Sequence, residues 1–96
     1  MAKNTVSKAD LVDLIAADTG HTKKDVKDVV DTFLLKITQH LDSTYRVQLT
    51  GFGTFEVRKR KARMGVRPGT TERIQIPESK YPAFRPGKGL KDRVRG

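Results

Sequence analysis

The stretch from Arg58 to Ile76 reads RKRKARMGVRPGTTERIQI and differs in kind from the rest of the chain. Its residues 58–73 include one acid, Glu72, and seven bases: Arg58, Lys59, Arg60, Lys61, Arg63, Arg67 and Arg73. With only Met64 and Val66 as large apolar residues, this stretch cannot bury a core, so it must project or be disordered. Turn residues at 67–70 and alternation at 73–76 favour a projecting two-stranded ribbon with a turn at its tip.

The charge of the whole sequence is equally asymmetric. The 96 residues carry a net charge of +9. Residues 1–45 contain six Lys and seven Asp, whereas residues 46–96 contain fourteen Lys or Arg and four acids. Because the excess positive charge lies in the second half, we expect one face or appendage to bind a polyanion. A nucleic acid, an anionic membrane and an acidic protein all satisfy that charge.

Two amphipathic helices are expected before the basic stretch. Ser7 with Asp10, and Thr22 with Asp25, are capping patterns, and Gly20 suits the end of the first helix. The second helix is expected to carry an apolar stripe made of Val26, Val29, Val30, Phe33, Leu34, Ile37 and Leu41. This stripe is wide for one short helix to cover, and 96 residues supply a thin core, so the pattern suggests a helical hairpin that dimerises.

The second half predicts strands and a short final helix. Residues 46–50 and 54–59 alternate as half-buried strands on either side of Gly51-Phe52-Gly53. Residues 81–84 lead from the ribbon back to the body and should bury Phe84, and a helix is expected from Lys88 through Arg95. The predicted fold class is α+β: a helical hairpin base, a three-stranded antiparallel sheet with a long arm at about residues 58–76, and a short C-terminal helix.

Several classes of function lack support in the sequence. It contains no cysteine, no apolar run long enough to span a membrane and no signal-peptide pattern, so we expect a cytoplasmic protein. His21 and His40 lack ligand spacing, and Asp25, Asp28 and Asp31 read as a solvated helix face. We therefore expect no enzyme, cofactor, metal site or small-molecule substrate.

Three motifs in register resemble one family. Gly51-Phe52-Gly53-Thr54-Phe55, Gly65-Val66-Arg67-Pro68-Gly69-Thr70 and the segment from Pro82 to Asp92 resemble the bacterial HU/IHF family of histone-like proteins. The resemblance covers about residues 6–95, which leaves residues 1–5 as a short tail before a single domain, 6–96. Val66, Arg67 and Thr71 depart from residues common at the family's arm tip, although the tip proline is present.

The resemblance implies an intertwined homodimer whose two arms wrap duplex DNA, associated with the bacterial nucleoid. It places eight residues in the core or dimer interface: Val30, Phe33, Leu34, Ile37, Leu49, Phe52, Phe55 and Phe84. Pro68 is then an intercalating wedge that bends DNA from the minor groove, rather than a simple turn proline. The phenylalanines are expected in the core and not as stacking platforms for single strands.

The predicted DNA-binding residues lie mainly in the arm. Lys88 and Lys91 are added because they flank a helix N-terminus, a position that suits a phosphate. The full set is Lys8, Arg58, Lys59, Arg60, Lys61, Arg63, Arg67, Pro68, Thr70, Arg73, Gln75, Lys80, Lys88 and Lys91.

The leading hypothesis is an architectural protein that bends and compacts duplex DNA with little sequence preference. An IHF-like subunit of a sequence-directed heterodimer, an RNA-binding protein and a basic module for acidic proteins or membranes are the alternatives. They differ in sequence preference, in competition by single-stranded RNA and in sensitivity to a change at Pro68.

Overall fold

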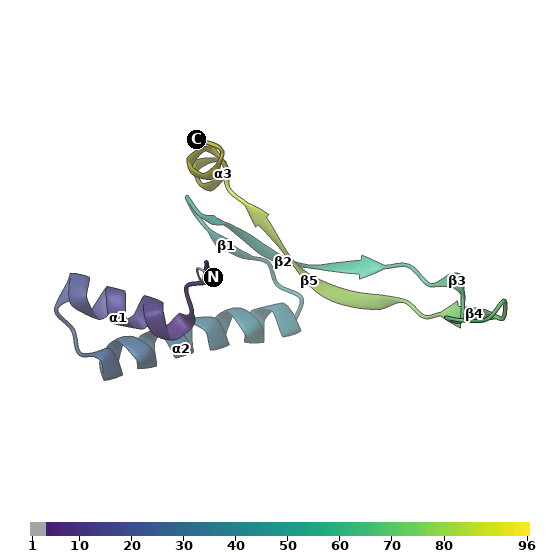
Figure 1. Cartoon of the computed structure of the whole chain (residues 1–96), viewed down its shortest axis with the longest axis horizontal. Coiled ribbons are helices and arrows are strands. Elements are labelled where there is room, and N and C mark those ends of the chain that lie inside the picture. The colour runs from purple at the N-terminus through teal and green to yellow at the C-terminus, as the bar shows by residue number, and fades with distance from the viewer. Residues whose placement is uncertain (1–3) are drawn as a thin grey trace. The chain divides into compact units, whose positions relative to one another are not determined.

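The computed structural model describes residues 4–96, so part of the expected tail, residues 1–3, lies outside the described residues. The chain divides into two compact units, one up to Thr38 and one from Gln39. The elements, labelled in Figure 1, are α1 (Lys8–Thr19), α2 (Lys23–Asp42), β1 (Val47–Leu49), β2 (Gly53–Arg60), β3 (Arg63–Val66), β4 (Arg73–Ile76), β5 (Ser79–Pro86) and α3 (Lys88–Arg95). None of the described helices is long and apolar enough to cross a membrane.

The first unit is the predicted helical hairpin. Helix α1 begins at a capping box, in which the Ser7 Oγ accepts from the Asp10 N–H at 3.1 Å and the Asp10 carboxylate accepts from the Ser7 N–H at 3.0 Å. It ends at Gly20, whose φ of 77° is left-handed. Helix α2 starts where the Thr22 Oγ accepts from the Asp25 N–H at 3.1 Å.

The core of this unit is small. Val12 and Ala16 of α1 pack with Val26 of α2, and Val30 lies against them half-buried. These residues recur at the spacing of one helical face, which is why the two helices join along it.

The second unit contains a three-stranded antiparallel sheet in the order β1-β2-β5. Strand β1 is shorter than the predicted strand 46–50, and β2 is longer than the predicted strand 54–59. The rings of Phe55 and Phe84, which are opposite each other in register, lie 4.8 Å apart, and Phe52 lies 5.5 Å from Phe84. A Cβ at Gly53 would stand 2.5 Å from the Phe84 ring, so only glycine fits beside this aromatic cluster.

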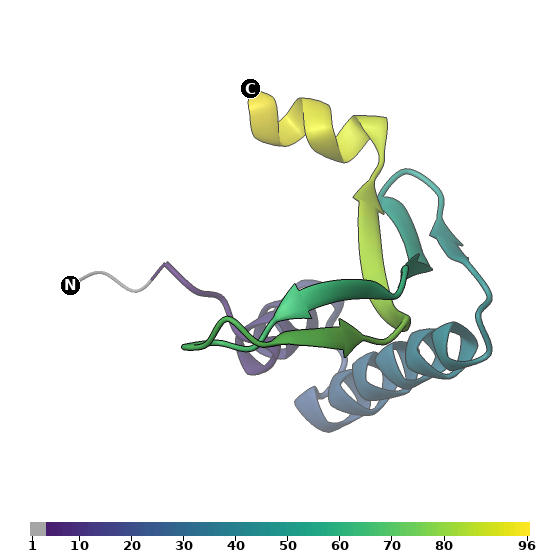
Figure 2. The ribbon, with the colours of Figure 1, turned by 90° about the vertical axis from the view of Figure 1, so that its right-hand side faces the viewer.

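Strands β3 and β4 form a separate two-stranded sheet that continues the β2–β5 ladder. The last pair of that ladder is Arg60 with Ser79, and the next pair is Arg63 with Ile76. Two residues separate these pairs on each strand, 61–62 and 77–78, so the register does not change across the interruption. Pro77 lacks an N–H and cannot donate to the ladder there. Figures 1 and 2 show the β3–β4 hairpin beyond the end of the β2–β5 ladder.

The opposite end of the ladder leads into α3. Gly87 follows β5 and donates its N–H to the Phe52 oxygen at 2.8 Å. A Cβ at Gly87 would lie 3.2 Å from that oxygen, a tight approach that favours glycine. No residue of α3 is buried within the described chain.

The predicted core and interface residues are only partly covered within one chain. Of the eight, Ile37 is buried, while Val30, Leu49 and Phe55 are half-buried. The remaining four expose substantial fractions: Phe33 49%, Leu34 44%, Phe52 48% and Phe84 37%. Phe84 therefore packs in the aromatic cluster but is not buried by this chain alone.

Candidate nucleic-acid interface

All fourteen residues predicted to contact DNA are exposed. The structure gathers most of them on one ribbon, formed by β2, β3, β4, β5 and the tip between β3 and β4. Lys88 and Lys91 lie in α3. Lys8 lies in the first unit, where its Nζ is 2.7 Å from Asp31 Oδ1.

The tip is a tight turn over residues 67–70. The Thr70 N–H donates to the Arg67 oxygen at 3.1 Å, and Gly69 has a φ of +79°. Proline second and a left-handed glycine third are typical of a type II turn. Pro68 is thus held at the apex with its ring exposed.

The Thr70 hydroxyl serves the turn. It donates to the Arg67 oxygen at 3.0 Å and accepts from the Glu72 N–H at 3.1 Å. These two bonds give Thr70 a role in holding the tip, and its contact with DNA stays a prediction.

Three of the arginines predicted to contact DNA already have partners. Arg67 Nε lies 3.2 Å from Glu72 Oε1, Arg58 Nε donates to Glu56 Oε2 at 2.8 Å, and the Arg60 guanidinium lies 4.5 Å from the Tyr81 ring centroid. These contacts restrict the arginine side chains while leaving them exposed to solvent.

The other predicted lysines and arginines of the ribbon have no ion-pair partner within residues 4–96. They are Lys59, Lys61, Arg63, Arg73 and Lys80. Lys59 is directly opposite Lys80 in register. Like charges at such a position destabilise a strand pair. A bound polyanion would reduce that repulsion.

Sequence reasoning missed Glu56, Arg85 and Tyr81. Glu56, 8% exposed, is the one buried charged residue among those described, and it accepts from Arg58 and from Arg85 Nη2 at 3.1 Å. Its hydrogen bond from Arg58, together with the charge of Arg85, lowers the pKa of Glu56. Glu56 could have been found as a lone acid two positions before Arg58 on a strand, but Arg85 is brought in by long-range pairing.

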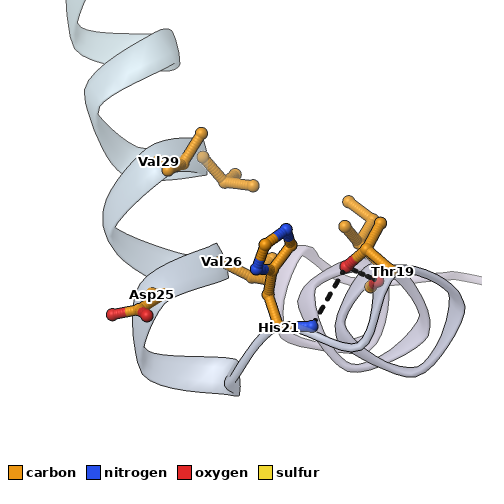
Figure 3. Close-up of a pocket in the computed structure, with 7 residues that line it drawn as sticks. Thr19, His21, Asp25, Val26 and Val29 are labelled. Atoms are coloured by element: carbon orange, nitrogen blue, oxygen red, sulfur yellow. Dashed lines mark hydrogen bonds between the residues drawn. The ribbon is translucent and has the colours of Figure 1, made fainter.

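A groove between α1 and α2 is lined by no lysine or arginine, unlike the ribbon. It has a volume of about 390 Å³ and is lined by Ile15, Thr19, His21, Asp25, Val26, Val29 and Val30. Figure 3 shows the Asp25 carboxylate turned away from the His21 ring, so the two do not form an acid–base pair. Among the described residues no cluster of three His, Asp or Glu is placed to hold a metal ion.

Comparison with known proteins agrees with this geometry. The DNA-binding protein HU of Thermus thermophilus is 64% identical over 94 residues, covering 98% of this chain and 97% of the relative. The HU protein of Thermotoga maritima is 50% identical over 90 residues, covering 94% of this chain and 100% of the relative. An Anabaena HU–DNA cocrystal structure matches with a TM-score of 0.85 at 41% identity, covering 92% of this chain and 96% of that one. A family model described as bacterial DNA-binding protein matches residues 6–95. With its basic ribbon, its proline tip and these similarities along nearly its whole length, the chain belongs to the HU/IHF family of bacterial DNA-binding proteins.

Proposed function

We propose that this protein is an architectural DNA-binding protein that holds duplex DNA between two ribbons and bends it with little sequence preference. The observation that carries the proposal is the exposed basic ribbon with Pro68 at its apex. A two-stranded ribbon can lie in a groove of DNA, with the lysine and arginine side chains of both protein strands directed to the phosphates. Such contacts neutralise the DNA backbone, which is the same for every sequence.

The bending step is assigned to Pro68. HU and IHF are themselves standard examples of proteins that insert an apolar side chain between base pairs from the minor groove and kink the duplex. Proline suits that position because its ring is rigid and it has no N–H to desolvate. The type II turn supports this role because it fixes the ring at the outermost point of the arm.

We further propose that the active form is an intertwined homodimer. Phe33, Leu34, Phe52 and Phe84 each leave more than a third of their surface exposed in a single chain. Large apolar residues exposed in this number are typical of a surface that a partner covers. A second copy would cover them and supply a second arm, so that the DNA is bent at two points.

Low sequence preference is expected from the chemistry of the ribbon. Lysine and arginine contacts to phosphate carry no base information, and the minor groove distinguishes little beyond A·T from G·C. A protein of this kind compacts chromosomal DNA, and we expect it in the bacterial cytoplasm, associated with the nucleoid.

The test is energy transfer between dyes at the two ends of a duplex of about 35 base pairs, which is short enough to behave as a stiff rod when free. The protein is titrated at about 50 and 200 mM salt, and the titration is repeated on a scrambled sequence. We expect the ends to approach equally for both sequences and less at high salt. Bending of one sequence alone would indicate a sequence-directed protein instead, and binding without approach of the ends would refute bending.

A further inference from the structure

One face of the β2–β5 ladder carries a row of arginines. In an antiparallel pair, residues opposite each other direct their side chains to the same face, and every second residue shares that face. Thr54 is opposite Arg85, Arg58 is opposite Tyr81, and Arg60 is opposite Ser79. Arg85, Arg58 and Arg60, here called the arginine row, therefore lie on one face, and the aromatic cluster of Phe55 and Phe84 lies on the other.

Two residues hold this row in place. The Glu56 carboxylate lies between two of its members, accepting from Arg58 Nε at 2.8 Å and from Arg85 Nη2 at 3.1 and 3.3 Å. The third member, Arg60, lies over the Tyr81 ring at 4.5 Å from its centroid, within the range of a cation–π contact. Tyr81 is itself half-buried, so its ring is a fixed platform.

The row keeps a net positive charge and remains accessible. The row has three guanidinium groups and only one carboxylate, that of Glu56, among them, and all three arginines are exposed to solvent. A cation held by an aromatic ring keeps its full charge, unlike one neutralised by an acid, so Arg60 can still bind a phosphate. An arginine restrained before binding loses less conformational freedom on contact with phosphate than a free one does.

We propose that Tyr81 is a positioning residue for DNA binding: it holds Arg60 in place so that the arginine row, along one face of the β2–β5 ladder, is already arranged when it meets the DNA backbone. Tyr81 acts through Arg60 and needs no DNA contact of its own. This inference rests on the proposed function, since it specifies how part of the same interface is prepared.

Substitution of Tyr81 tests the positioning of the row more cleanly than substitution of Glu56. Loss of Glu56 would leave two arginines without their shared partner and disturb the sheet. Tyr81→Val removes the ring but keeps a residue favoured in strands. Tyr81→Phe keeps the ring and removes the hydroxyl, through which Tyr81 also interacts with Arg58. Tyr45→Val is the matched control, because Tyr45 is exposed and lies outside both the ladder and the arm.

Affinity for duplex DNA is measured for these variants, for Arg60→Ala and for the double variant Arg60→Ala/Tyr81→Val. We expect Tyr81→Val to weaken binding about two- to fivefold, as for an exposed cation–π contact, and Tyr45→Val to bind as the wild type does. Tyr81→Phe keeps the ring beneath Arg60 and should bind DNA more tightly than Tyr81→Val does. Arg60→Ala should cost less affinity in the Tyr81→Val background than alone, because the ring no longer positions the arginine. Thermal unfolding checks that each variant is folded.

A second readout needs neither DNA nor a variant. The side-chain NMR signals of Arg60 in the free wild-type protein should show the upfield shift caused by an aromatic ring, and Tyr81→Phe should retain it. Absence of that shift would overturn the inference even if Tyr81→Val failed to fold. The inference would also be overturned if Tyr81→Phe and Tyr81→Val weakened DNA binding equally. The same holds if the losses of affinity caused by Arg60→Ala and Tyr81→Val were additive in the double variant. A wild-type protein that does not bind duplex DNA would instead refute the proposed function itself.

Discussion

Arg67 and Glu72 face each other across the tip of the arm and are joined twice. The Arg67 N–H donates to the Glu72 oxygen at 2.9 Å, and Arg67 Nε lies 3.2 Å from the Glu72 carboxylate. The backbone bond belongs to the turn, whereas the ion pair places the only acid of residues 58–73 beside the arginine that precedes Pro68. The two bonds can be separated by experiment, because a side-chain substitution removes only the second.

Glu72→Gln should strengthen binding without changing the bend. Removal of the carboxylate frees Arg67 for phosphate and takes a negative charge away from the DNA, an effect of about two- to fivefold at low salt. The bend should stay the same because the turn is held by Pro68, Gly69 and the Thr70 hydroxyl. Energy transfer and titration measure the two quantities together. Glu78→Gln is the control for net charge, and an equal gain from it would show that release of Arg67 has no part.

Pro68→Ala should reduce bending more than affinity. Alanine is accepted at the second position of the turn, but it presents a smaller wedge and an N–H that must lose its water. We expect the bend to fall by about 20° or more, with most phosphate contacts intact. The exposed neighbour Thr71 provides the control Thr71→Ala. Equal bends for wild type and Pro68→Ala would remove the wedge role from this residue.

Gly53→Ala should destabilise the second unit. The added Cβ would meet the Phe84 ring at 2.5 Å and the Arg85 oxygen at 2.8 Å, and the backbone oxygen cannot move aside cheaply. We expect a loss of about 1–3 kcal/mol in the free energy of unfolding. Gly89→Ala is the matched control, because its Cβ would have only an ordinary contact at 3.6 Å and alanine favours the helix. Urea unfolding at one fixed protein concentration compares the two, and equal stabilities would contradict the packing described.

Glu56 should contribute to loss of stability in acid. Its pKa is held below the ordinary 4.5 by the hydrogen bond from Arg58 and by Arg85. Because the folded pKa lies below the unfolded one, this contribution is complete above pH 4.5 and is lost as the pH falls through the folded pKa. Glu56→Gln should therefore flatten the fall in stability over about pH 3–5, as followed by unfolding at each pH. Glu78→Gln removes an exposed acid without an ion pair in residues 4–96, and an identical slope for both variants would exclude this role for Glu56.

The elements that depend on local patterns were predictable from the sequence. Ser7 and Asp10 predicted the start of α1, and residues 73–76 were correctly predicted as a strand. The extent of β5 was not evident, because Pro82 and Pro86 read as strand breakers. β5 is an edge strand, where a proline can direct its missing N–H away from the neighbouring strand.

The candidate interface likewise contains residues that local sequence predicts and contacts that depend on long-range pairing. Its exposed bases and the Pro68 tip follow from composition and turn chemistry alone. The contact of Arg85 with Glu56 spans 29 positions and depends on the exact register of two strands. Tyr81 likewise reaches Arg60 only through that register, and nothing local in the sequence marks either contact.

The register of the ribbon is unchanged from Gly53 opposite Pro86 to Val66 opposite Arg73. The length of the arm therefore depends directly on the number of residues in its strands. Deletion of one residue from one strand alone would turn every side chain beyond it in that strand to the other face. Removal of two residues from each strand would preserve both faces and bring the tip about 7 Å nearer the sheet. The length of the two strands therefore sets the distance between the arginine row and Pro68, and with it the place on the DNA at which we propose that Pro68 acts.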